Sequence, residues 1–262
     1  MKSEWNKLDN AAKIFPAAQS KKDTQVFRFS CELYKTVNKD LLQKATEDTL
    51  EEFDIFKSIL RRGLFWYYLE ESDIKPIVRE EYKIPCSLIY QRNNHKLLFE
   101  VTYYRNRINL EVFHVLTDGT GAMNFLKTLV SNYLTLAENV EDSGVDYDAS
   151  STQKSDDSFS KYYSGKISSK QENNPVAYKI VGRKYPDDKL KVINGMVDVK
   201  KVLEESHKYN ATLTAFLSAV LIKSIIDEMP VRSKGKKPIT ILIPVNLRNL
   251  LPIRFGKKLF TV

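Results

Sequence analysis

The chain has 262 residues, of which 42% are hydrophobic and 28% are charged, and 41 lysines and arginines against 33 acidic residues give a formal net charge of +8. This composition excludes intrinsic disorder, collagen-like repeats and a coiled coil, and it can supply a real hydrophobic core. The cations are interleaved with acids, and neither zinc-finger spacing nor an aromatic RNA-binding signature is present. We therefore expect no nucleic-acid partner.

The chain shows no pattern of export or membrane insertion. Residues 1–23 contain no uninterrupted apolar region of signal-peptide length. The longest apolar stretch, residues 211–229, is interrupted by three charged residues and is shorter than the ~20 residues that a bilayer span requires. Two cysteines far apart in sequence, Cys31 and Cys86, suit reduced thiols better than a disulfide framework. The sequence thus predicts a cytoplasmic protein without a membrane span.

The first elements predicted along the chain are a strand and a helix. Residues 26–34 alternate apolar and polar side chains, which is typical of a half-buried strand. Asn38 can cap a following helix, in which apolar residues recur at helical spacing from Leu42 to Leu60, as far as the break at Gly63.

A run of short strands follows. The segments 86–90, 97–104 and 108–114 are rich in strand-forming residues, and short polar segments of hairpin-turn length divide them. An antiparallel meander is expected there. Directly after it, residues 121–136 have the apolar periodicity of an amphipathic helix.

A change of composition divides the chain. Between residues 141 and 174 the sequence becomes rich in Ser, Asp, Lys, Gln and Asn, over a length unusual for a loop within one domain. We expect an N-terminal lobe over residues 1–140, a linker or surface loop over 141–175, and a second lobe over 176–262.

The second lobe is predicted to alternate strands and helices. Residues 189–197 can form a strand, and Asp198 can cap a short helix that reaches residue 209. An apolar helix over residues 212–229 follows and stops at Pro230. Residues 238–245 form a continuous β-branched run, characteristic of a strand buried on both faces.

One group of residues suggests chemistry. His114 follows Ile108, Leu110 and Val112 on one face of the predicted strand, and burial there would leave a neutral ring able to accept a proton near pH 7. Asp118 lies one short loop away, and glycines at 119 and 121 permit a tight backbone before the next helix. This arrangement could place a general base at the edge of a cleft.

A single histidine on an apolar face is, however, more often an ordinary core residue. The other two histidines, His95 and His207, lie in a predicted turn and on a polar helix, without partners at metal-ligand spacing. No metal site is therefore expected. The chain also lacks a Gly-x-Ser-x-Gly elbow, a P-loop and a dinucleotide-binding glycine pattern.

Four segments resemble parts of one known superfamily. The segment from Phe113 to Gly121, followed by an apolar helix, resembles the His-x-x-x-Asp-Gly active-site motif of the chloramphenicol-acetyltransferase-like superfamily, which includes condensation domains of peptide synthetases. Residues 209–217 and 243–248 resemble its later helix and strand-to-arginine segment. Residues 8–16 resemble the beginning of bacterial alcohol-acetyltransferase-like members.

The resemblance implies a two-lobed α/β fold with mixed, largely antiparallel sheets. The chain covers about the N-terminal three-fifths of a typical member, so the second lobe is expected to be incomplete. Condensation domains usually carry two adjacent histidines, and Phe113 in place of the first favours the single-histidine acetyltransferase branch.

The resemblance also implies a function. His114 would be the general base that moves an acyl group, most simply acetyl, from a coenzyme A thioester to an alcohol or amine. Asp118, Gly119 and Arg248 would support the site, with Asp118 paired to Arg248, although by itself Arg248 suits a solvated loop. The donor could be acyl-CoA or an acyl carrier protein, and no bound cofactor is expected. The alternatives are a non-catalytic binding module on the same scaffold and an inactive fragment.

Overall fold

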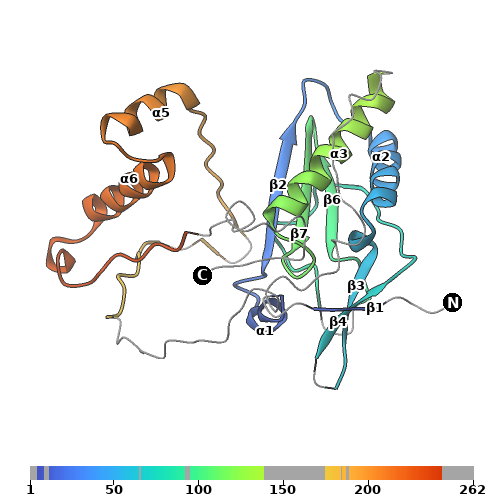
Figure 1. The fold of residues 1–262 in the computed structure, drawn as a ribbon, viewed down its shortest axis with the longest axis horizontal. Helices are drawn as coiled ribbons and strands as arrows, with labels where there is room; N and C mark the ends of the chain where they lie inside the picture. The colour runs from blue at the N-terminus through green and yellow to red at the C-terminus, as the bar shows by residue number, and fades with distance from the viewer. Residues whose placement is uncertain are drawn as a thin grey trace. The chain divides into compact units, whose positions relative to one another are not determined.

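The computed structural model describes residues 5–8, 12–64, 66–91, 95–138, 175–183, 185–186 and 189–243. These residues belong to two compact units, whose described parts are residues 5–138 and 175–243 (Figure 1). The predicted linker lies almost entirely outside the described residues, so the boundaries of the two lobes stay predictions.

The first unit contains two sheets. The larger has the strand order β2-β7-β6-β5, and only its β5–β6 pair is parallel. Its strands are β2 (Val26–Glu32), β5 (Arg79–Glu80), β6 (Phe99–Tyr104) and β7 (Arg107–Phe113). The smaller sheet is antiparallel, with β4 (Tyr67–Glu71) between β1 (Trp5–Lys7) and β3 (Ser58–Arg62). A mixed α/β fold with largely antiparallel sheets is thereby confirmed.

Helices cover one face of the larger sheet. The helical segments of this unit are α1 (Ile14–Ala18), α2 (Lys39–Glu52), the 3₁₀ turn η1 (Asp54–Lys57) and α3 (Gly119–Glu138). The helices α2 and α3 pack against each other beside the sheet (Figure 1). Phe125 of α3 stacks on Phe56 and contacts Phe99 of β6 edge-on, with ring centroids 4.1 and 5.4 Å apart. Because Phe99 pairs with Val112, the helices lie on the face that carries Ile108, Leu110 and Val112.

The central strand β7 is buried on both faces. Its residues 108–113 are all at most 2% exposed, including the polar residues Asn109 and Glu111. The irregular segment that follows β5 contributes to covering the second face, since Tyr90 stacks on Phe113 with ring centroids 5.5 Å apart. An alternating pattern therefore produced a buried polar layer here rather than a solvated face.

The helix after Asn38 is shorter than predicted. Asn38 caps it as expected, because its side-chain oxygen accepts from the amides of Asp40 and Leu41 at 2.9 and 3.2 Å. The helix ends at Glu52, however, and Leu60 lies in β3, opposite Leu69 of β4. Pairing with a strand later in the chain overrides the helical spacing of the apolar residues.

The predicted meander is right for two of its three strands. The strands β6 and β7 form a hairpin whose two-residue turn, Arg105 and Asn106, begins with a positive φ of 54° at Arg105. Residues 86–90 are not a strand, and Cys86 adopts a φ of 59° that an extended run does not allow. The outer edge of β6, where the meander would place residues 86–90, pairs instead with β5, in the parallel direction.

The described part of the second unit is helical. Its elements are α5 (Val199–Lys208), α6 (Leu213–Glu228) and the 3₁₀ turn η3 (Val231–Ser233). Asp198 caps α5 by accepting from the amides of Lys200 and Lys201, and Thr212 caps α6. These two helices are confirmed. The strands predicted over residues 189–197 and 238–245 are wrong where described, since residues 189–197 and 238–243 form no ladder with any strand of the described chain.

No single helix among the described residues is long and apolar enough to cross a membrane. The pair α5 and α6 reaches that length and composition only when taken together, and the two helices meet at 83°.

Candidate functional site

His114 is the first residue after β7. Its backbone amide donates to the carbonyl of Gln25 at 2.8 Å, which continues the pairing of β2 and β7 by one residue. The residue is half-buried, and its Nδ1 atom is among the buried side-chain atoms. One of the two ring nitrogens is therefore withdrawn from solvent.

Two phenylalanines enclose the His114 ring. Phe15 of α1 stacks on it almost in parallel, with ring centroids 4.4 Å apart and planes 5° apart. Phe27 of β2 lies 4.8 Å away, tilted by 58°. The alternation of residues 26–34 places Phe27 on this side of the sheet, whereas no local sequence pattern relates Phe15 to His114.

Asp118 caps α3. Its Oδ1 atom accepts from the amide of Gly121 at 2.9 Å, and its backbone carbonyl accepts from the amide of Ala122 at 3.0 Å. A carboxylate at this end of a helix is also favoured by the helix dipole. In the described chain Asp118 thus fixes the start of α3, directly after the loop from His114.

The two glycines of the motif differ in their surroundings. Neither adopts a positive φ. Among the described residues, a Cβ at Gly119 would meet the ring of Phe29 at 3.8 Å, whereas a Cβ at Gly121 would collide with the hydroxyl of Thr117. Close packing against Thr117 therefore favours glycine at 121, whereas the described neighbours of Gly119 leave room for a side chain.

Arg248 lies outside the described residues, so its pairing with Asp118 stays a prediction. The cleft expected between residues 1–140 and 176–262 stays a prediction as well.

A network of charged side chains lies on the opposite face of β7. Arg28 of β2 donates to Glu111 at 2.8 Å and to Glu81 at 2.6 Å, and Arg107 reaches Glu81 at 3.0 Å. The amide of Cys86 donates to the same Glu111 oxygen at 2.7 Å. These bonds fasten the irregular segment after β5 to the sheet.

Two members of the network, Arg28 and Cys86, have raised pKa values. Burial alone would lower the pKa of Arg28, but its bonds and charge attraction to Glu81 and Glu111 outweigh burial and raise that pKa. Burial, followed by the charge of Glu111, raises the pKa of the Cys86 thiol. The sequence analysis did not predict this network, although Arg28 and Glu111 are polar residues that alternate with apolar residues in two predicted strands.

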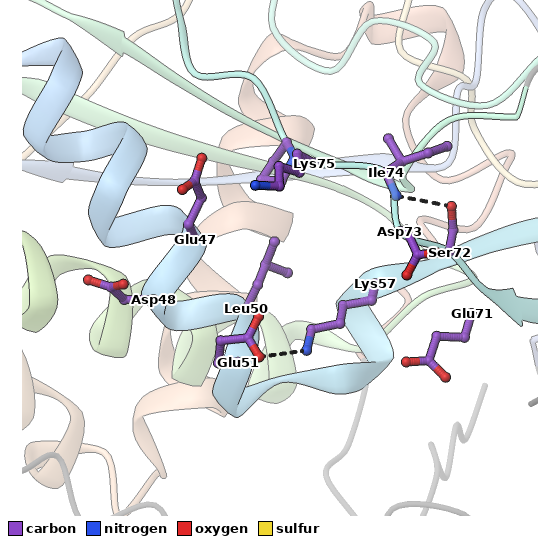
Figure 2. A pocket seen from close by; sticks show the side chains of 11 residues that line it. Glu47, Asp48, Leu50, Glu51, Lys57, Glu71, Ser72, Asp73, Ile74 and Lys75 are labelled. Carbon is purple, nitrogen blue, oxygen red and sulfur yellow. Dashed lines mark hydrogen bonds and ion pairs between the residues drawn. The ribbon is translucent and has the colours of Figure 1, made fainter. Parts of the chain in front are cut away.

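Two pockets elsewhere in the first unit are lined by neither His114 nor Asp118. One of about 490 Å³ lies beside α2 and combines five carboxylates with two lysines, and Figure 2 shows Lys57 extended toward Glu51, at 3.2 Å. Another, of about 370 Å³, is lined by Arg61, Arg62 and Tyr90 among others. Within the described ranges, no group of three or more His, Cys, Asp or Glu side chains could hold a metal ion.

The chain was compared with known proteins. No protein-family model matches it, and no curated protein does. Among solved structures it is similar to polyketide synthase associated protein 5 from Mycobacterium tuberculosis, with 18% identity and a TM-score of 0.39, over 53% of this chain and 34% of that one.

Two condensation domains are also similar. The starter condensation domain of the rhizomide synthetase matches with 13% identity and a TM-score of 0.43, over 55% of this chain and 41% of that one. The first condensation domain of the CDA synthetase matches with 11% identity and a TM-score of 0.45, over 57% and 45%. The matched region spans less than half the length of each of these structures.

The arrangement described here can support proton transfer. A half-buried imidazole, held by backbone pairing and by two aromatic rings, stands at the end of a rigid central strand. A capped helix begins five residues later. A general base needs a fixed position within hydrogen-bond reach of the proton that it accepts.

Proposed function

We propose that the protein containing this chain is an acyltransferase that uses His114 as its general base. The substrate class is an acyl thioester, most simply acetyl-CoA, and the acceptor is an alcohol or an amine. The observation that supports this function is the placement of His114, half-buried and directly after the buried strand β7, at the head of a His-x-x-x-Asp-Gly motif.

In the proposed reaction, Nε2 of His114 accepts the proton of the acceptor hydroxyl or amine as its oxygen or nitrogen attacks the thioester carbonyl. The tetrahedral intermediate then collapses, the carbon–sulfur bond breaks, and the imidazolium returns the proton to the departing thiolate. The products are an ester or amide and a free thiol. The donor can carry its thiol on coenzyme A or on an acyl carrier protein, since both present the same thioester.

Asp118, Gly119 and Arg248 are proposed to support the site rather than to transfer protons. Asp118 Oδ1 accepts from the Gly121 amide. A carboxylate has two oxygens and can accept several bonds, so the same side chain can also pair with the guanidinium of Arg248. Such a pair would join the two proposed lobes, residues 1–140 and 176–262.

A cytoplasmic location is part of the proposal. Cys31 and Cys86 are both free thiols, which suits a reducing compartment.

The test is a thiol-release assay with acetyl-CoA and a panel of alcohols and amines, on this chain and on any longer product of the same gene. His114→Ala should lower kcat by roughly two to four orders of magnitude, the usual contribution of a positioned general base. His95→Ala, at an exposed histidine, is the matched control and should keep full activity. Melting temperatures of all three proteins separate lost catalysis from lost folding.

Two results would reject this function. If the wild type releases no thiol with any acceptor, or if His114→Ala keeps full activity, the chain is better explained as a non-catalytic binding module on the same scaffold.

A further inference from the structure

We infer that Phe15 is a positioning residue for His114: its ring fixes the plane of the imidazole so that one edge of that ring faces the substrate. This inference rests on the proposed function for its consequence in catalysis. The stacking on which it depends can be measured without any activity.

The ring of Phe15 lies flat against the ring of His114. Phe15 and His114 are parallel to within 5°, with centroids 4.4 Å apart, so the phenyl ring covers one face of the imidazole. Phe27 lies 4.8 Å from the same ring at an angle of 58°. An imidazole held in this way cannot turn about its Cβ–Cγ bond without displacing an aromatic side chain, because aromatic rings in contact resist interpenetration.

The position of α1 is itself fixed, which makes Phe15 a rigid support. Gln19, which follows α1, donates from its side-chain amide to the carbonyl of Tyr90 at 3.2 Å and to that of Thr24 at 3.4 Å. Ala12, just before α1, is 3% exposed and its carbonyl accepts from the Phe15 amide at 3.3 Å. In Figure 1 α1 lies near the beginning of β2, where the antiparallel partner β7 ends.

The stack affects catalysis because the orientation of the His114 ring determines where its two nitrogen atoms lie. Nδ1 of His114 is buried, and the proposed function assigns the proton transfer to Nε2. A rotation of the ring would move Nε2 away from the position that this transfer requires. Displacements of about 1 Å in a reacting group can cost as much as 100-fold in rate, so a support of this kind acts on kcat rather than on substrate binding.

The experiment compares three variants of the same short helix with the wild type. Phe15→Leu keeps an apolar side chain but removes the flat ring, Phe15→Tyr keeps the ring, and Ile14→Ala changes the neighbouring residue, which is 62% exposed. The imidazole resonances of the three histidines are assigned by His95→Gln and His207→Gln, and the melting temperature of each variant is recorded.

The first readout is the resonance of the His114 ring protons. In the wild type and in Phe15→Tyr we expect them to be displaced upfield by the ring current of the stacked side chain. In Phe15→Leu that displacement should be lost, while Ile14→Ala should retain it. If the His114 resonances are the same in Phe15→Leu and in the wild type, there is no stack and the inference is overturned.

The second readout is catalysis. Phe15→Leu should lower kcat by roughly 10-fold to 100-fold with KM unchanged, and Phe15→Tyr and Ile14→Ala should keep the wild-type kcat. If the resonances move but kcat stays the same in Phe15→Leu, Phe15 packs on His114 without positioning it for reaction, and the inference fails while the proposed function stands. If the wild type itself is inactive, the proposed function fails, and the role of Phe15 in catalysis fails with it.

Discussion

Arg28 and Glu111 face each other across the pair of strands β2 and β7, and the guanidinium Nε donates to a Glu111 carboxylate oxygen at 2.8 Å. The Glu111 side chain is 2% exposed and that of Arg28 is 14% exposed. The pair is therefore largely withdrawn from water, where a charge without its partner is costly.

Removing either charge should destabilise the first unit. Arg28→Met leaves Glu111 buried as an anion without its guanidinium, and Glu111→Gln leaves Arg28 with Glu81 alone. Each variant should lose about 3–5 kcal/mol of unfolding free energy in urea titrations. The double variant Arg28→Met/Glu111→Leu should lose less than the sum of the two.

The matched control for this pair is Lys35→Met. Lys35 pairs with Glu138 at 3.0 Å, but the two side chains are 80% and 40% exposed. Its loss should cost no more than about 1 kcal/mol. If Lys35→Met and Arg28→Met lose the same unfolding free energy, burial does not determine how much these ion pairs stabilise the fold.

Asp118 should tolerate asparagine better than alanine. Asparagine keeps an oxygen that can accept from the Gly121 amide, so Asp118→Asn should melt close to the wild type, while Asp118→Ala should lose about 0.5–2 kcal/mol. Both variants should lower thiol release, because both remove the charge proposed to pair with Arg248. Asn38→Ala, which removes the cap of α2, provides a control with a similar loss of stability and unchanged activity.

The two glycines of the motif should respond differently to alanine. Gly119→Ala should be tolerated, since the nearest atom to the new methyl group is 3.8 Å away. Gly121→Ala should lower the melting temperature because the methyl group collides with the Thr117 hydroxyl. Adding Thr117→Ala should restore much of that loss, and a melting temperature for Gly121→Ala at or above that of Gly119→Ala would refute the collision.

The two cysteines should make the fold sensitive to alkaline pH. Burial raises the pKa of Cys31 and of Cys86 above their ordinary value of 9.0, and the charge of Glu111 contributes further at Cys86. Above pH 9 the unfolded chain therefore releases these protons before the folded chain does, so the unfolding free energy falls as pH rises. Urea titrations between pH 8 and about 10 should show a steeper fall for the wild type than for Cys31→Ala/Cys86→Ala. Equal slopes would mean that neither thiol is shifted.

Features that depend on neighbours in sequence could be predicted from the sequence alone. The caps at Asn38 and Asp198 are right because a short polar side chain reaches amides two or three residues ahead. The turn at Arg105 and Asn106 is right because two polar residues between apolar runs suffice for a hairpin. The place of His114 at the end of a strand follows from the same local pattern.

The tertiary structure decided everything that depends on residues far apart in the chain. Leu60 joins a strand because Leu69 lies opposite it, and β5, rather than residues 86–90, pairs with the outer edge of β6. The stack of Phe15 on His114 has the same origin. Local propensities are worth a fraction of a kcal/mol per residue, whereas burial of an apolar side chain is worth about 1.5–3 kcal/mol, so the packing of distant segments determines where the local pattern holds and what surrounds the histidine.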